Sequence, residues 1–219
     1  MSETDIPHLG DIPHLDDIAG MVDPAKTALI VVDVQVDFAS PEGLLGRVGV
    51  DMSPAVAVID NINAMIAAAR HAGATVGFMR VVTRPETDSP ILTTWMERRG
   101  RAGGEAICRT DTGGADYYGV TPEPGDIEIE KLKYSSFWGT DLDAQLRAKG
   151  IDTLVIAGIT TDCCVDSTTR DAFHRDYHVF VVSDGCTAYD DGLHGWALRS
   201  MSEHCALLVT SDTVVKAWS

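Results

Sequence analysis

The stretch DTLVIAGITTDCCVDSTTRDA, residues 152–172, changes its residue pattern part-way along its length. Its first part, DTLVIAG, is a short run of apolar and β-branched residues, which favours a strand buried on both faces. From Cys164 onward the apolar residues recur at helical spacing among polar ones, which indicates a helix. A buried strand that leads into a helix is the repeating unit of a parallel α/β sheet.

The same alternation of apolar runs and helical segments recurs along the chain from residue 27. Five further runs are predicted to be strands: TALIVVDV (27–34), ATVGFMRVV (74–82), DIEIE (126–130), HVFVVSD (178–184) and CALLV (205–209). Helices are predicted between the strands, at 55–73, 140–150, 164–176 and 194–204. The sequence therefore predicts an α/β protein with three αβα layers, in which helices cover both faces of a mainly parallel six-stranded sheet.

The overall composition is that of a folded globular protein. Hydrophobic residues make up 45% and charged residues 23% of the 219 residues, which is ordinary usage and argues against disorder. The formal net charge of −16 disfavours nucleic acid and anionic membranes as partners. The first residues lack a signal-peptide pattern, and no apolar run approaches the length of about 18 residues that a transmembrane helix needs. We therefore expect a soluble, cytoplasmic protein.

Two parts of the chain fall outside the strand and helix pattern. Residues 1–24 carry a tandem DIPHLG and DIPHLD with His8 and His14, and this acidic, proline-broken segment favours an extended arm over a metal site. The predicted organisation is an arm at 1–24 and a single domain at 25–219. Residues 83–125 are rich in Gly, Pro and charge. Such an excursion either shapes a ligand pocket beyond the strand ends or forms a plain surface insertion, and both alternatives stay open.

Reactive side chains follow three of the predicted strands. Asp33 ends the first run, Lys131 follows the third, and Cys163 and Cys164 follow the fourth. Each is unremarkable alone, but the carboxyl ends of parallel strands share one edge of a sheet, where the three would place a thiol beside a carboxylate and a cation. A thiol of ordinary pKa needs such help to react, and the first turn of a helix adds backbone N–H groups that favour a thiolate or an oxyanion.

The cysteine count favours reduced thiols. Five cysteines without regular spacing or a signal peptide argue against a disulfide framework. They are Cys108, Cys163, Cys164, Cys186 and Cys205. Adjacent cysteines join only through a strained ring, so the use of Cys163 and Cys164 as a redox pair remains a minor alternative.

Three motifs, in this order and spacing, resemble the signature segments of the isochorismatase-like cysteine hydrolase family. They are VVDVQVDF (31–38), EKLKYSSFWGTDLDAQLRAKGI (130–151) and GITTDCCVDSTTRDA (158–172). The family includes nicotinamidase, N-carbamoylsarcosine amidase, biuret hydrolase and ureidoacrylate amidohydrolase. The resemblance implies a Rossmann-like fold and a triad in which Asp33 is the general base, Lys131 the cation and Cys164 the nucleophile. Cys163 takes a variable position.

The resemblance also implies a mechanism. The backbone N–H groups of Thr160 and Cys164 would form the oxyanion hole, aided by a cis peptide bond before Thr160. The implied reaction is a two-step acyl transfer through a thioester or thiocarbamate on Cys164, with no cofactor. Relatives are commonly dimers or tetramers, so we expect a homodimer or a homotetramer.

Departures from individual relatives narrow the expected activity. Nicotinamidases hold a metal with histidines after the second strand, but FMRVVTRPETDSPILTTWMERR (78–99) contains none, which predicts a site without metal. Isochorismate-cleaving members lack the nucleophilic cysteine that Cys164 supplies here. We therefore expect hydrolysis of a small amide or ureide, with vinyl ether hydrolysis, a redox thiol protein and a catalytically silent binding protein as alternatives. The expected substrate contacts are Phe38, Gln35, Arg84 and Trp138.

One histidine is left with two interpretations. His194 matches a histidine at the start of the late helix in relatives. It would serve as a lid or an inter-helix contact, or simply as a satisfied surface histidine, which is the more common case.

Overall fold

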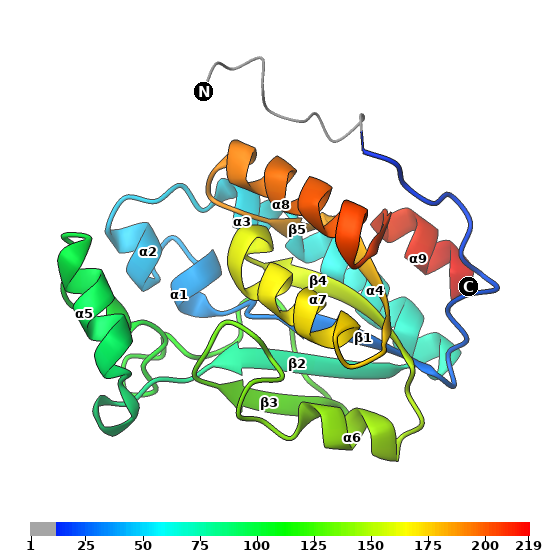
Figure 1. Ribbon diagram of the computed structural model, residues 1–219, viewed down its shortest axis with the longest axis horizontal. Coiled ribbons are helices and arrows are strands. Elements are labelled where there is room, and N and C mark those ends of the chain that lie inside the picture. The colour runs from blue at the N-terminus through cyan, green and yellow to red at the C-terminus, as the bar shows by residue number, and fades with distance from the viewer. Residues whose placement is uncertain (1–11) are drawn as a thin grey trace.

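The computed structural model describes residues 12–219 (Figure 1). Its centre is one sheet with the strand order β3-β2-β1-β4-β5-β6. The strands are β1 (Thr27–Val32), β2 (Thr75–Val81), β3 (Ile127–Lys131), β4 (Thr153–Ile159), β5 (His178–Thr187) and β6 (Leu207–Val209). Every pairing between neighbouring strands is parallel. The predicted six-stranded sheet is thus confirmed.

Helices cover both faces of the sheet, which makes three layers (Figure 1). Alternate side chains of a strand point to opposite faces, so Ile30 and Val32 join one buried cluster and Leu29 and Val31 the other. The first cluster is closed by α6 (Leu142–Ala148), α7 (Asp166–Phe173) and α8 (Asp191–His204), and the second by α4 (Ile59–Ala72) and α9 (Ser211–Ala217). The αβα architecture is therefore confirmed.

Shorter helices gather beyond the carboxyl ends of the strands, at the left of Figure 1. They are α1 (Val36–Ala39), α2 (Leu44–Arg47), α3 (Ser53–Ala57) and α5 (Pro90–Arg98). The helix predicted at 55–73 is divided at Val58 into α3 and α4, and α9 was not predicted. At the end of α4, Gly73 has a φ of 79°, a left-handed conformation that glycine adopts without strain.

Residues 12–24 run along the β6 edge of the same fold. His14 forms an isolated bridge with Leu208, and its Nε2 lies 2.9 Å from Ser183 Oγ. Ile18 and Val22 are buried, and Trp218 Nε1 donates to the Val22 carbonyl oxygen at 3.0 Å. His8 lies outside the described residues. Within residues 12–219, no helix combines the length and apolar character needed to cross a membrane.

Candidate active site

Asp33 stands one residue beyond β1 at the centre of the sheet. Asp33 is fully buried. Its backbone has a φ of 52°, a left-handed conformation that aspartate tolerates better than most residues. The Asp33 N–H donates to the Met79 carbonyl oxygen at 2.9 Å. The end of β1 therefore turns sharply and holds the carboxyl group inside the protein.

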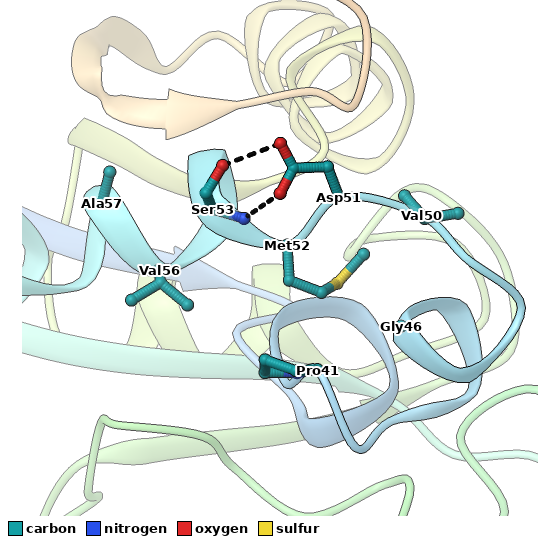
Figure 2. A pocket seen from close by; sticks show the side chains of 8 residues that line it. All are labelled: Pro41, Gly46, Val50, Asp51, Met52, Ser53, Val56 and Ala57. Carbon is teal, nitrogen blue, oxygen red and sulfur yellow. Dashed lines mark hydrogen bonds between the residues drawn. The ribbon is translucent and has the colours of Figure 1, made fainter.

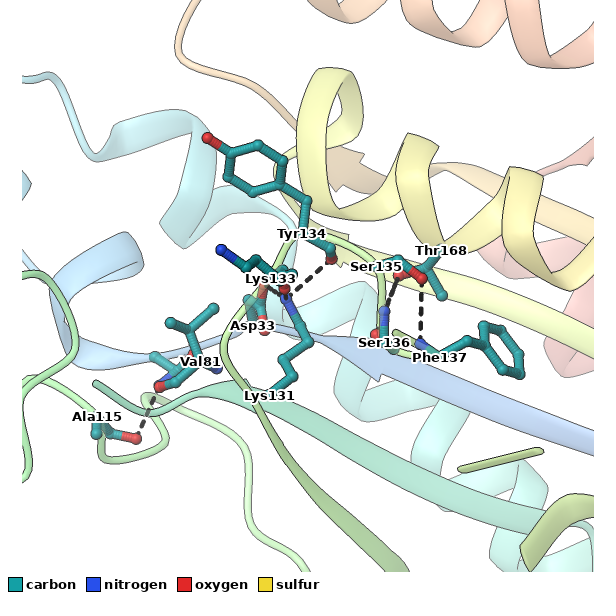
Figure 3. A network of polar contacts seen from close by, with 11 residues as sticks. Asp33, Val81, Ala115, Lys131, Lys133, Tyr134, Ser135, Ser136, Phe137 and Thr168 are labelled. Atoms are coloured by element: carbon teal, nitrogen blue, oxygen red, sulfur yellow. Dashed lines mark hydrogen bonds and ion pairs between the residues drawn. The ribbon is translucent and has the colours of Figure 1, made fainter. Parts of the chain in front are cut away.

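Lys131 is the last residue of β3, and its side chain is also fully buried. Its Nζ donates to Asp33 Oδ2 at 2.7 Å and to the carbonyl oxygens of Lys133 and Tyr134, each at 3.0 Å (Figure 3). These three acceptors use all three donors of the ammonium group. Asp33 Oδ1, in contrast, is buried and has no hydrogen-bond partner among the described residues.

Cys164 lies in a π-helical turn, Thr161–Val165, between β4 and α7. Such turns are frequent at functional sites. The Thr160 carbonyl oxygen accepts from the N–H groups of Cys163 and Val165, both at 3.1 Å, and the Ile159–Thr160 peptide bond is cis, as the resemblance implied. Cys164 is 6% exposed, whereas Cys163 is half-buried. The nucleophile position is thus inside the protein and its neighbour is nearer the surface.

The three side chains perturb one another strongly. Burial raises the pKa of the Asp33 carboxyl, although Lys131 and the Cys164 thiol act in the opposite direction. Burial alone would lower the pKa of Lys131, but the attraction of Asp33 and Cys164 outweighs it and raises that pKa. Lys131 and Asp33 therefore form a charged pair in which the ammonium holds its proton firmly.

The pKa of the Cys164 thiol is raised well above its ordinary value. The hydrogen bond with the Cys163 thiol contributes most, followed by burial and by the charge of Asp33, and Lys131 opposes them. Lys131 lowers the thiol pKa as expected, but the Cys163 contact, burial and the Asp33 charge outweigh it in the resting protein. The thiol keeps its proton until a base removes it.

The loops that carry these groups are tied to the helices behind them. Ser135 donates to Asp171, and Ser136 Oγ lies 3.0 Å from Thr168 Oγ1, so the segment after Lys131 is fixed on α7. Thr161 Oγ1 and His194 Nδ1 are hydrogen-bonded at 2.8 Å. His194 therefore makes the inter-helix contact that the sequence left open, between α8 and the turn of Cys164.

Comparisons with known proteins agree with this geometry. Residues 27–213 match the isochorismatase domain. The chain belongs to the isochorismatase family. Ureidoacrylate amidohydrolase RutB of Methylobacterium radiotolerans is 41% identical over 192 residues, which cover 82% of this chain and 74% of that protein.

Solved structures place the chain in the same family. A cysteine hydrolase from Pseudomonas syringae pv. phaseolicola has a TM-score of 0.81 at 26% identity, covering 90% of this chain and 94% of that chain. N-carbamoylsarcosine amidase from Thermoplasma acidophilum has a TM-score of 0.65 at 30% identity, covering 85% and 97%. The resemblance to isochorismatase-like hydrolases is thus confirmed, and the chain is a hydrolase of non-peptide carbon–nitrogen bonds.

Gln35, which the sequence predicts to contact the substrate, is hydrogen-bonded to the protein backbone. It is fully buried, and its Nε2 donates to the carbonyl oxygens of Val81 and Ala115 at 2.8 and 2.9 Å. Its Oε1 accepts from the Val81 N–H at 2.8 Å. Because both amide hydrogens are used by the backbone, Gln35 joins the end of β2 to the segment at Ala115. Its contact with a substrate stays a prediction.

The other expected contacts lie nearer the surface. Phe38 is partly buried, and its carbonyl oxygen accepts from the Tyr189 hydroxyl at 2.6 Å. The Arg84 guanidinium is 3.5 Å from Glu130. Trp138 is 59% exposed, and its ring faces the Lys133 ammonium at 5.8 Å. The contacts of these three side chains are thus with residues outside the triad, and their role as substrate contacts stays a prediction.

The segment 83–125 folds back onto the strand ends. Isolated bridges join Thr83 to Arg109 and Gln35 to Tyr117, and Asp37 Oδ2 accepts from the Cys108 N–H at 2.7 Å. The segment therefore borders the loop that follows Asp33. The structure therefore favours a segment that helps to shape the site over a plain surface insertion.

A separate hollow of about 650 Å³ lies among the α1 to α3 helices (Figure 2). Its lining residues are Pro41, Gly46, Val50, Asp51, Met52, Ser53, Val56 and Ala57. None of the triad side chains lines it. Asp51 is occupied at the start of α3, where Ser53 N–H and Oγ donate to its carboxylate at 2.9 and 2.8 Å.

Across residues 12–219, no three His, Cys, Asp or Glu side chains are grouped in a way that could hold a metal ion.

Proposed function

We propose that this protein is a metal-independent cysteine amidohydrolase that cleaves a carbon–nitrogen bond of a small ureido substrate, with Cys164 as the nucleophile. The observation that carries the proposal is the buried cluster of Asp33, Lys131 and Cys164 at one edge of the sheet. The relative that acts on ureidoacrylate, at 41% identity, supports a substrate of that kind.

The first step forms a covalent intermediate. Asp33 accepts the proton of the Cys164 thiol, and the sulfur attacks the ureido carbonyl carbon. The high pKa of this thiol makes the base necessary, and the raised pKa of Asp33 makes it a better proton acceptor. Asp33 then gives the proton to the leaving nitrogen, the carbon–nitrogen bond breaks, and a thiocarbamate remains on Cys164.

The second step regenerates the enzyme. Asp33 accepts a proton from water, the water oxygen attacks the thiocarbamate carbon, and the carbon–sulfur bond breaks as the proton returns to the Cys164 sulfur. Lys131 keeps its charge in both steps and stabilises the Asp33 carboxylate. We assign the oxyanion hole to the backbone N–H groups of Thr160 and Cys164, which lie at the π-helical turn.

Metal independence is supported by the available donors. The segment 78–99 contains no histidine, and the described part of the chain offers no group of three metal-ligating side chains. The proposed chemistry also needs no metal, because Asp33 moves the proton and Lys131 supplies the positive charge.

The paired cysteines provide the test. Ammonia release is measured on ureidoacrylate, biuret, an N-carbamoyl amino acid and maleamate, with chelator present. We expect Cys164→Ala to lower kcat/KM by about 10⁴-fold or more, because the nucleophile is lost. The matched variant Cys163→Ala removes the adjacent thiol and should keep kcat/KM within about tenfold of the native value. Activity that survives in Cys164→Ala and disappears in Cys163→Ala would overturn the assignment.

A further inference from the structure

A second lysine stands directly beside the buried ion pair. The Lys131 ammonium donates to the carbonyl oxygen of Lys133 at 3.0 Å, so the backbone of Lys133 is fixed against the catalytic cluster. The side chains of Lys133 and Tyr134 both extend away from Lys131 (Figure 3). Unlike Lys131, Lys133 is only partly buried.

The ammonium group of Lys133 is held in place without being neutralised. Its Nζ donates to Ser89 Oγ at 2.8 Å and lies 5.8 Å from the centre of the Trp138 ring. An ammonium has three donors, so the Ser89 contact leaves two of them free, and an aromatic face stabilises the charge without using a donor. Among the residues that the structure describes, no carboxylate forms an ion pair with Lys133.

Three arginines near this edge already have carboxylate partners. Arg80 and Arg84 both contact Glu130, at 2.9 and 3.5 Å. Arg109 contacts both oxygens of Asp88, at 2.7 and 2.5 Å. An anion arriving at the site would therefore compete with a protein carboxylate at each of these three arginines, but not at Lys133.

We propose that Lys133 binds a carboxylate of the substrate, which makes short ureido acids the preferred substrate class over neutral ureides. This inference rests on the proposed function, since it concerns the same site. The carboxylate of such an acid lies a few bonds from the reacting carbonyl. Lys133 is similarly close to the proposed base, because Lys131 contacts both Asp33 and the Lys133 carbonyl oxygen. In a chain of net charge −16, a fixed local cation also offsets the repulsion of an anionic substrate.

The test compares one acid with its neutral counterpart. The substrates are 3-ureidoacrylate and its methyl ester, each with ¹³C in the ureido carbonyl, and the readout is labelled carbon dioxide, so that ester cleavage is not counted. For the native enzyme we expect a kcat/KM ratio that favours the acid. Lys133→Met should lower that ratio by about 10- to 100-fold, mainly through the KM of the acid, because a charge-assisted hydrogen bond is lost. Lys133→Arg should retain most of the preference.

Two further variants distinguish an effect of Lys133 from that of other cations. Lys149→Met removes the same charge at the end of α6 and should leave the ratio within about twofold of native. Arg84→Met tests the paired cation, and a loss of acid preference in this variant but not in Lys133→Met would overturn the inference.

The outcomes also distinguish this inference from the function on which it rests. Native enzyme that hydrolyses both substrates with no preference for the acid contradicts the role of Lys133 and leaves the amidohydrolase intact. If the native enzyme hydrolyses neither substrate, the proposed ureide substrate is contradicted, and so is the inference about Lys133.

Discussion

The middle of the sheet and its carboxyl edge are equally buried but are filled with opposite kinds of side chain. In the middle, Leu29, Ile30 and Leu154 are fully buried and apolar. At the edge, Asp33 and the side chain of Lys131 are buried to the same extent and carry opposite charges. The change from one environment to the other takes a single residue beyond the end of β1.

This difference shows that the charged groups at the carboxyl edge contribute less to stability than apolar side chains would. Burying apolar area stabilises the fold, whereas each buried ion costs several kcal/mol that only excellent pairing recovers. Lys131 finds three acceptors, but Asp33 Oδ1 finds no donor in the described structure. A buried charge left partly unsatisfied is typical of a functional site, where a reacting group takes the missing contact.

Of the substitutions that compare the two regions, removal of Lys131 should have the largest effect, because it damages both activity and stability. In Lys131→Met the Asp33 charge stays buried without its partner, which costs about 3–5 kcal/mol of unfolding free energy. We also expect kcat/KM to fall by about 10³-fold, since the cation of the site is lost. Urea unfolding and ammonia release measure the two losses.

The double variant Asp33→Asn with Lys131→Met is the control for this interpretation. It removes both charges, so its unfolding free energy should be higher than that of Lys131→Met alone, while its kcat/KM should be lower still because the proposed base is also lost. A Lys131→Met protein as stable as the native one would show that the buried pair is not what distinguishes the edge from the middle of the sheet.

A substitution in the middle of the sheet should affect stability alone. Leu154→Ala removes buried apolar volume from β4 and should cost about 2–5 kcal/mol of unfolding free energy. The kcat/KM of the folded fraction should stay within about twofold of native, because Leu154 lies near the start of β4, at the end opposite to the charged side chains. A large loss of kcat/KM in folded Leu154→Ala would mean that the two regions are mechanically coupled.

The sequence predicts the sheet and the triad for the same reason. A strand buried on both faces is recorded locally as an apolar run, and the residue that follows it comes to the shared edge. Asp33, Lys131 and Cys164 could therefore be placed together although they lie far apart in the chain. The short α9 was missed because its pattern, SDTVVKA, is too brief to show helical spacing.

The supporting contacts could not be predicted, because each depends on where two distant segments meet. Gln35 is held by backbone groups 46 and 80 residues away, so its position in a motif gave no sign that its amide was already used. The partner of Ser135, Asp171, lies on another element. The net direction of the Cys164 pKa could not be predicted for a similar reason, since it depends on burial and on the Cys163 contact, which spacing does not reveal.

The smallest expected effect concerns His194, which holds the turn of Cys164 at the carboxyl edge through Thr161. Burial lowers its pKa, and Asp191 and Asp162 oppose this only in part. The unfolded chain therefore takes up a proton at a higher pH than the folded protein does. Stability from neutral His194 is fully present above its ordinary pKa of about 6.5 and is lost as the pH falls below that value.

Two substitutions separate the hydrogen bond from the titration. His194→Ala loses the contact with Thr161 and should cost about 1 kcal/mol of unfolding free energy near pH 7.5. His194→Asn keeps a polar atom near the position of Nδ1 but does not titrate, so it should lose less stability than the native protein between about pH 7.5 and 5.5. Urea unfolding at both pH values gives the comparison. An equal loss in both proteins would mean that the proton affinity of His194 does not change on folding, and that its contact with the Cys164 turn is independent of pH.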